Sequence, residues 1–126
     1  MKSFRSGPIV KRSVAMAKPI RGIEIYLPLE DNAGEPIPVA KFVALQDELL
    51  KRFGGVTSLQ RRFPLQGAWR SGPEIYYDEV VVFSAMDFRE ATHLECLRYL
   101  ERLKERLKKK FDQLEILITV ADMLAI

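Results

Sequence analysis

The sequence predicts an α+β fold, a ferredoxin-like βαββαβ sandwich in which two helices cover one face of an antiparallel sheet. Two segments, residues 38–53 and 92–111, repeat apolar side chains every three or four positions, as amphipathic helices do. Segments with the composition of β-strands precede and follow each of them. With 126 residues, 48% of them hydrophobic and 29% charged, the chain has the size and composition of one globular domain.

The first predicted strand covers residues 23–27. Its apolar side chains alternate with Glu24 and Tyr26, which places those two residues on the opposite face of the strand. Pro28 ends the strand because proline has no N–H to donate to a sheet. The residues that follow, 30–36, are rich in turn formers and predict a loop.

The first helix is predicted from about Pro38 to Phe53. Proline suits the first turn, where its missing N–H is not needed. The pair Gly54-Gly55 supplies the residue type that ends helices in the left-handed conformation. The apolar stripe that should face the sheet comprises Phe42, Leu45, Leu49 and Phe53.

The middle of the chain predicts a hairpin. Residues 56–70 contain a proline and a glycine, so we expect an irregular strand at an edge of the sheet. A turn at 71–73 leads into the strand 75–83, which has the strongest β-propensity in the chain. The last four residues of that strand are all apolar, which is typical of a central strand buried on both faces.

A second helix begins near Thr92, and a final strand covers 115–121. The apolar stripe of this helix comprises Leu97, Leu100, Leu103, Leu107 and Phe111. The strands 75–83 and 115–121 carry apolar residues at both parities, so the face of the sheet without helices should also be apolar. A large apolar face usually marks an interface or a ligand groove, and we expect this one to be covered.

Charge divides the chain into two parts. Six of the 20 Lys and Arg residues, but none of the 17 acids, lie within residues 1–22. We therefore predict a basic, flexible N-terminal arm over 1–22 and a single ferredoxin-like domain over 23–126 with a net charge of −3. An arm of this kind suits nucleic acid or another polyanion, or it is an ordinary solvated tail.

Five residues are candidates for a ligand site. Trp69 is the only tryptophan and stands beside Arg70, a pair that could hold an aromatic ligand or close the edge of the sheet. Tyr77 and Glu79 share one face of their strand, and Tyr26 lies on the first strand. A phenol and a carboxylate on an enclosed face could serve acid–base chemistry, although such groups more often line a rim.

The sequence does not indicate a disulfide, a metal site, a phosphate-binding loop or a membrane segment. Cys96, as the single cysteine, cannot form an internal disulfide. Cys96 and His93 share a helix face, but no further cysteine or histidine could complete a metal site, and no glycine-rich phosphate loop is present. We therefore expect no metal and no cofactor. No apolar run reaches about 20 residues and the start lacks a secretory signal, so we expect a cytoplasmic protein that does not enter a membrane.

One pattern resembles a known group. The run Phe53-Gly54-Gly55-Val56-Thr57, then Gly67-Ala68-Trp69-Arg70, then an apolar strand is similar to small bacterial proteins with a Gly-x-Trp hairpin. The resemblance covers residues 23–121 and implies a ferredoxin-like fold without an established activity. The basic arm has no counterpart in it.

Three functions remain open at this point. The first is a non-enzymatic protein that self-associates, at least as a homodimer, through its open sheet face and binds a small apolar or aromatic ligand there. The second is a small dimeric α/β-barrel enzyme, monooxygenase-like or isomerase-like. The third is a nucleic-acid-associated accessory protein that uses the basic arm.

Overall fold

The computed structural model describes residues 17–58, 65–71, 74–88 and 93–126, and it describes the side chains of 17–56, 80–88 and 94–126. Residues 1–16 of the predicted arm therefore lie outside the described residues. In chain order the elements are β1 (Lys18–Pro28), α2 (Val39–Phe53), β2 (Val56–Ser58), β3 (Leu65–Ser71), β4 (Glu74–Asp87), α3 (His93–Lys110) and β5 (Leu117–Ala125).

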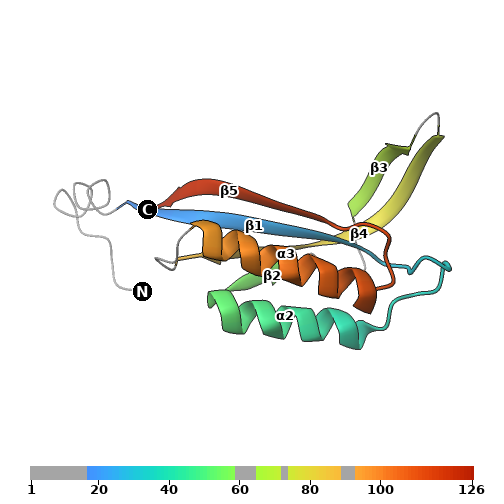
Figure 1. Ribbon diagram of the computed structural model, residues 1–126, viewed down its shortest axis with the longest axis horizontal. Helices are drawn as coiled ribbons and strands as arrows, with labels where there is room; N and C mark the ends of the chain where they lie inside the picture. The colour runs from blue at the N-terminus through green and yellow to red at the C-terminus, as the bar shows by residue number, and fades with distance from the viewer. Residues whose placement is uncertain (1–16, 59–64, 72–73, 89–92) are drawn as a thin grey trace, which may run out of the picture.

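The strands form one antiparallel sheet with the order β2-β4-β1-β5, and β3 also pairs with β4. Both helices lie on the same face of this sheet (Figure 1). The predicted ferredoxin-like α+β fold is thereby confirmed. The irregular edge strand expected over residues 56–70 is two short strands, β2 and β3, which pair with different parts of β4.

The first strand is longer than predicted. It begins at Lys18, because residues 18–22 pair with residues 121–125 of β5. These residues carry two of the basic side chains that we grouped with the arm, so that part of the arm belongs to the sheet. Charge pattern alone could not show this, because Lys18 and Arg21 keep contact with water at the end of the strand, where charged side chains are tolerated.

The α2 helix matches its predicted stripe. All four predicted stripe residues are buried. Pro38 is the N-cap residue rather than the first helical residue. Gly54 adopts the left-handed conformation, with φ at 83°, and its N–H donates to the carbonyl of Leu50 at 2.8 Å. The expected glycine cap is confirmed.

The α3 helix differs from its prediction at one position. Leu100, Leu103, Leu107 and Phe111 are buried, whereas Leu97 is only partly buried and the neighbouring Cys96 takes the core position. The first turn of the helix therefore presents a slightly rotated face to the sheet. The core between helices and sheet also includes Ile23, Ile25, Leu27, Val81 and Phe83. Burial of this many large apolar side chains is the main source of stability in a domain of this size.

Polar contacts join neighbouring elements at two places. The first lies near the start of α3, where Arg21 and the buried Asp87 are cross-strand partners whose side chains lie 3.6 Å apart. The burial of Cys96, together with the nearby Asp87 carboxylate, raises the pKa of the Cys96 thiol. Between the helices, Glu48 accepts hydrogen bonds from the Tyr99 hydroxyl at 2.6 Å and from Arg106 at 2.6 and 3.1 Å. The second cluster holds α2 and α3 in one relative position.

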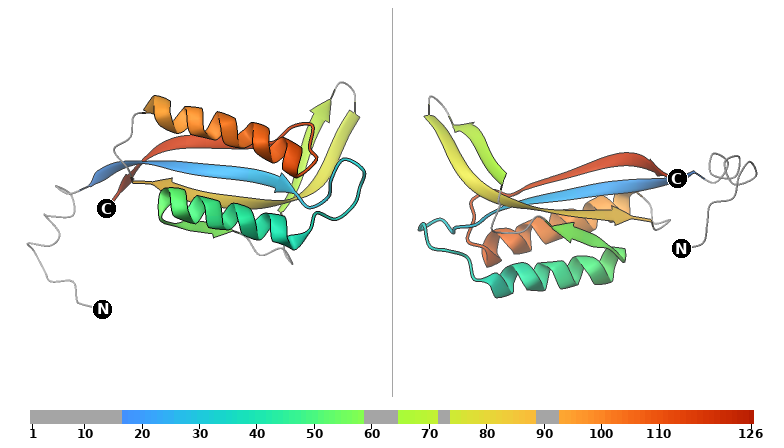
Figure 2. Two further views of the ribbon diagram at one scale, coloured as in Figure 1. Left: turned by 60° about the horizontal axis from the view of Figure 1, so that its bottom comes forward. Right: turned by 180° about the vertical axis from the view of Figure 1, so that it is seen from behind.

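The hairpin of β3 and β4 leaves the plane of the sheet. Figure 2 shows it rising from one end of the sheet, on the side away from the helices. The helix-free face is thus bounded at that end by the hairpin and lies open over the middle of the sheet.

Candidate functional site on the helix-free sheet face

The helix-free face is built from three cross-strand rows. Antiparallel partners point to the same side of a sheet, and the neighbours of Gly22, Glu24 and Tyr26 along β1 face the helices. The rows therefore follow from the register of β5, β1 and β4. They are Leu117–Tyr26–Val82, Thr119–Glu24–Ser84 and Ala121–Gly22–Met86.

A hollow of about 440 Å³ lies over the second and third rows. Space for the hollow arises because Gly22, which has no side chain, and Ala121, which has only a methyl group, are direct cross-strand partners. Met86 and Met123 line it with thioether side chains, and Val56 borders it at β2. The volume falls within the range of ordinary small-molecule sites.

One side of the hollow is polar. The Glu24 carboxylate lies between two hydroxyl residues, Thr119 and Ser84, in the same row. The Tyr26 hydroxyl donates a hydrogen bond to Glu24 Oε1 at 2.8 Å, and this bond raises the pKa of Tyr26. A ligand in the hollow would thus meet an apolar surface on one side and an acceptor carboxylate with two hydroxyls on the other.

This composition corrects the expected apolar face. Both the polar row and Tyr26 lie on it, so it is mixed rather than apolar throughout. Met86, Leu117 and Met123 are 46%, 57% and 40% exposed, so a substantial apolar part remains open. On β5 the apolar residues Leu117 and Ala121 face this side, and Thr119 between them faces the same way.

The five predicted ligand-site residues are spread along the sheet. Tyr26 is on the helix-free face beside the hollow. Trp69, Arg70, Tyr77 and Glu79 lie in the β3–β4 hairpin, and their side chains are outside the described part of the structure. In the register, Trp69 is opposite Tyr76, while Tyr26 is opposite Val82, six positions away on β4. That separation is about 20 Å of strand, so the backbone does not gather these residues around one point.

Sequence reasoning missed most of the hollow. Glu24 was recognised only as a residue on the other face of its strand, and Ser84, Thr119 and the two methionines were not singled out. The alternation of β1 and β5 contained the signal, since it assigns residues to faces. The missing information was the register, which decides that Gly22 meets Ala121 and that Glu24 meets Thr119.

Within the described ranges, no three His, Cys, Asp or Glu side chains are grouped as a metal site would need. No described helix is long and apolar enough to cross a membrane.

Comparison with known proteins finds solved structures of similar fold. No protein-family model matches the chain, and no curated protein does. A phage SAM lyase solved in complex with S-methyl-5'-thioadenosine is similar, with a TM-score of 0.60 and 12% identity over 84% of this chain and 90% of that one. A phage SAM lyase in the apo state has a TM-score of 0.58 and 13% identity over 100% of this chain and 92% of that one. At these identities the likeness establishes a shared fold.

Proposed function

We propose that this protein binds a small molecule in the hollow of the helix-free sheet face. The observation that carries the proposal is the juxtaposition of the Glu24 carboxylate with an apolar floor and two thioether side chains. A binding site of this kind selects a ligand with an apolar or aromatic body and a cationic or hydrogen-bond-donating group. The hydroxyls of Ser84 and Thr119 provide further polar contacts beside the carboxylate.

The class of ligand that we propose is a nucleoside carrying sulfur, as thioether or sulfonium. One structural neighbour was solved with such a thioether, S-methyl-5'-thioadenosine. The adenine ring would supply the flat apolar body, and a sulfonium would place its positive charge near Glu24. Because an ion pair in a partly enclosed site is stronger than in water, Glu24 should favour the sulfonium over the neutral thioether.

Self-association is the second part of the proposal. Met86, Leu117 and Met123 are exposed on the same face as the hollow, and β5 is an edge strand with pairing recorded only to β1 among the described strands. Contact between two helix-free faces would remove these side chains from water and enclose the hollow. We propose a homodimer, or a larger assembly, formed in this way.

The test of the ligand proposal is calorimetric titration with S-adenosylmethionine and with S-methyl-5'-thioadenosine. Both should bind the wild-type protein. Glu24→Gln should weaken binding of the cationic S-adenosylmethionine about tenfold, or about 1.4 kcal/mol, because the substitution removes the charge that attracts the sulfonium. The same substitution should change binding of the neutral thioether less than about threefold.

Glu35→Gln is the matched control, because Glu35 is an exposed acid in the loop before α2, away from the hollow. It should leave both affinities unchanged. If neither compound binds at millimolar concentration, the proposed ligand class is wrong. Equal weakening of both ligands by Glu24→Gln would contradict charge recognition by that residue.

A catalytic role is the second candidate. The observation that favours it is the hydrogen-bonded pair of Tyr26 and Glu24 at the hollow, a proton donor and an acceptor 2.8 Å apart, in a fold shared with a SAM lyase. Incubation with S-adenosylmethionine, followed by chromatography for S-methyl-5'-thioadenosine, tests it. Release above the spontaneous rate that Glu24→Gln and Tyr26→Phe both abolish would establish catalysis, and binding without release would leave a binding protein.

A further inference from the structure

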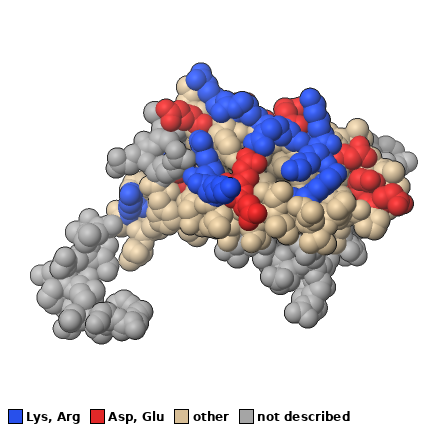
Figure 3. Space-filling model, turned by 90° about the horizontal axis from the view of Figure 1, so that it is seen from below, with Lys and Arg blue, Asp and Glu red and all other residues tan. Residues whose placement is uncertain are grey.

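Charge is segregated between the two layers of the fold. The helices α2 and α3 together contain ten Lys and Arg residues and five acids, whereas the five strands contain three basic residues and six acids. Figure 3 views the helix layer and shows Lys and Arg side chains gathered across it. The helix layer is therefore positive and the sheet negative, although the whole chain has a net charge of only +3.

Some of these basic side chains already have acidic partners. Arg106 pairs with Glu48, and Lys104 lies 3.0 Å from Glu115. Lys108 lies 3.7 Å from Glu105 and 3.9 Å from Glu115. These ion pairs neutralise part of the positive charge at the sides of α3.

A second group has no such partner. Arg98, Arg102 and Lys109 are exposed and form no ion pair with any other residue in the part of the chain that the structure describes. At 3.6 residues per turn, these three positions fall within about 40° of one another around the helix. That side is opposite to the buried Leu107, so the three form one outward ridge, which we call the α3 ridge. The exposed Glu105 falls on the same side of the helix, where it pairs with Lys108.

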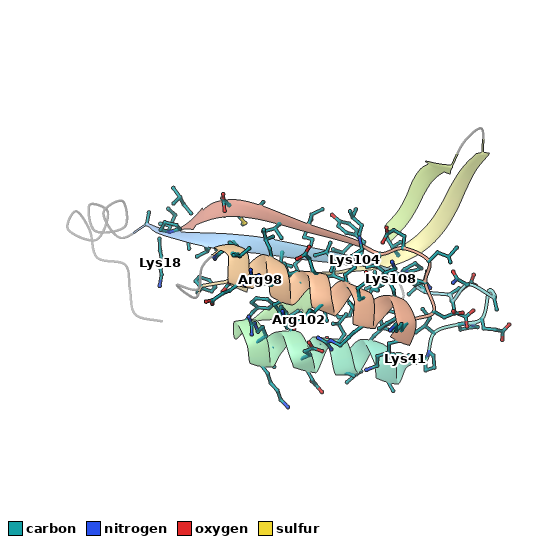
Figure 4. The ribbon with its side chains drawn as sticks, in the orientation of Figure 1. Lys18, Lys41, Arg98, Arg102, Lys104 and Lys108 are labelled. Carbon is teal, nitrogen blue, oxygen red and sulfur yellow. The ribbon has the colours of Figure 1, made fainter. Side chains whose placement is uncertain are left out.

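The ridge is extended rather than compact. Arg98 and Lys109 are separated by about 16 Å along the helix axis, at about 1.5 Å per residue. A single phosphate cannot contact both ends, whereas one strand of a duplex passes about five phosphates over that length, at about 3.4 Å each. Lys104 and Lys108 lie beside the ridge, and Figure 4 shows them with Arg98 and Arg102 along α3.

A membrane surface fits this layer less well. The exposed apolar residues of α2, Val39, Val43 and Leu50, lie on the side of that helix away from α3. The α3 side of α2 is identified by Glu48 and its contacts with α3. A helix that lies in a membrane interface needs a continuous apolar side next to its basic residues. Among the described residues of α3, Leu94 alone is an exposed large apolar residue beside the ridge, and the exposed apolar residues of α2 lie on the far side of that helix.

We propose that the α3 ridge binds the phosphate backbone of a nucleic acid, without sequence preference. The partner follows from an extended row of cations without acidic partners, next to which α3 exposes a single large apolar side chain among its described residues, Leu94. Three contacts predict weak binding that falls with salt, with a log–log slope of about −3 on duplex DNA at about −0.9 per contact. This surface is on the opposite face from the hollow, so the proposal is independent of the proposed ligand.

The test is fluorescence anisotropy of the full chain with a labelled mixed-sequence DNA duplex, from low to physiological salt. The variant Arg98→Gln/Arg102→Gln/Lys109→Gln should lose at least tenfold in affinity at low salt and flatten the salt slope by about 3. A charge-matched control, Lys2→Gln/Arg5→Gln/Lys11→Gln, removes three positive charges from the N-terminal segment. It should lose less than threefold. The charge-preserving variant Arg98→Lys/Arg102→Lys/Lys109→Arg should keep its affinity.

Each other outcome overturns the proposal. Loss of binding in the N-terminal control but not in the ridge variant would assign the contact to the predicted basic arm. Absence of DNA binding with flotation on anionic vesicles would assign the helix layer to membranes. Absence of DNA binding at low salt would leave the ridge as a solvated surface. The thermal midpoint of each variant should lie within a few degrees of the wild-type value, which checks that every protein compared is folded.

Discussion

The side chain of Met123 lies over Gly22. A Cβ placed on Gly22 would clash with Met123 Sδ and would stand 3.3 Å from its terminal methyl carbon, a tight contact. The absence of a side chain at position 22 therefore allows a thioether from β5 to lie on β1. This contact shapes the floor of the hollow on the helix-free face.

Gly22→Ala should displace Met123 and reshape the hollow. Met123 is 40% exposed and has room to turn outward, so the fold should tolerate the change with a shift of only a few degrees in the thermal midpoint. Affinity for S-methyl-5'-thioadenosine should fall, as measured by calorimetric titration. Adding Met123→Ala to this variant should restore part of the binding, because the clash is removed. Unchanged affinity in Gly22→Ala would place the ligand elsewhere.

Leu103→Ala should destabilise the protein by about 2–5 kcal/mol, because Leu103 is completely buried and the substitution leaves a cavity. Leu100, 4% exposed, should behave in the same way. Leu94→Ala is the control on the same helix, since Leu94 is 53% exposed and should cost less than about 0.5 kcal/mol. Urea denaturation measures all three. Similar losses for Leu94 and Leu103 would contradict the helix orientation.

Gly54→Ala should destabilise by about 1 kcal/mol. Gly54 has a φ of 83°, a conformation that L-residues adopt at a cost. The adjacent Gly55 does not have a positive φ, and nothing lies within 4 Å of an added Cβ, so Gly55→Ala is a matched control that should be close to neutral. Thermal or urea unfolding compares the two variants. Equal effects at both positions would argue against the left-handed cap.

Glu48 should make stability depend on acid pH. Its hydrogen bonds with Arg106 hold the pKa of Glu48 below its usual range. A carboxyl whose folded pKa is lowered contributes stability that is present above the unfolded pKa, about 4.3, and lost as pH falls through the folded value. The difference in urea midpoint between wild type and Glu48→Gln should therefore be largest near neutral pH and vanish in strong acid.

The Glu48 side chain is 33% exposed, so the same difference should shrink in high salt. Glu105→Gln, at a 67% exposed acid on α3, is the control and should show little pH-dependent difference. A Glu48 effect that stayed constant from pH 7 to strong acid would indicate a packing role instead of an ionic one.

Charge introduced on the helix-free face should prevent self-association. We expect light scattering at micromolar concentration to show at least a dimer for the wild type. Met86→Glu/Leu117→Glu should give a monomer, because burying two unpaired carboxylates is costly. Leu114→Glu is the control, since Leu114 is 83% exposed in the segment between α3 and β5. A monomeric wild-type protein that binds no hydrophobic dye would rule the assembly out.

The helices were the most predictable part of the fold. The four stripe residues of α2 and the left-handed Gly54 follow from spacing and residue type within one segment, and the structure has them as predicted. Strand limits were less predictable. Whether Lys18 belongs to a strand depends on Ala125, its partner at the other end of the chain.

The fold class follows from the sequence, because helix periodicity, strand alternation and turn residues are local properties that together allow few arrangements. The candidate site, in contrast, depends on the tertiary structure. Cross-strand register sets Glu24 beside Thr119 and Gly22 beside Ala121. Register arises from pairing between distant segments and from packing of the whole core, and a shift of one residue would turn each of these side chains to the other face.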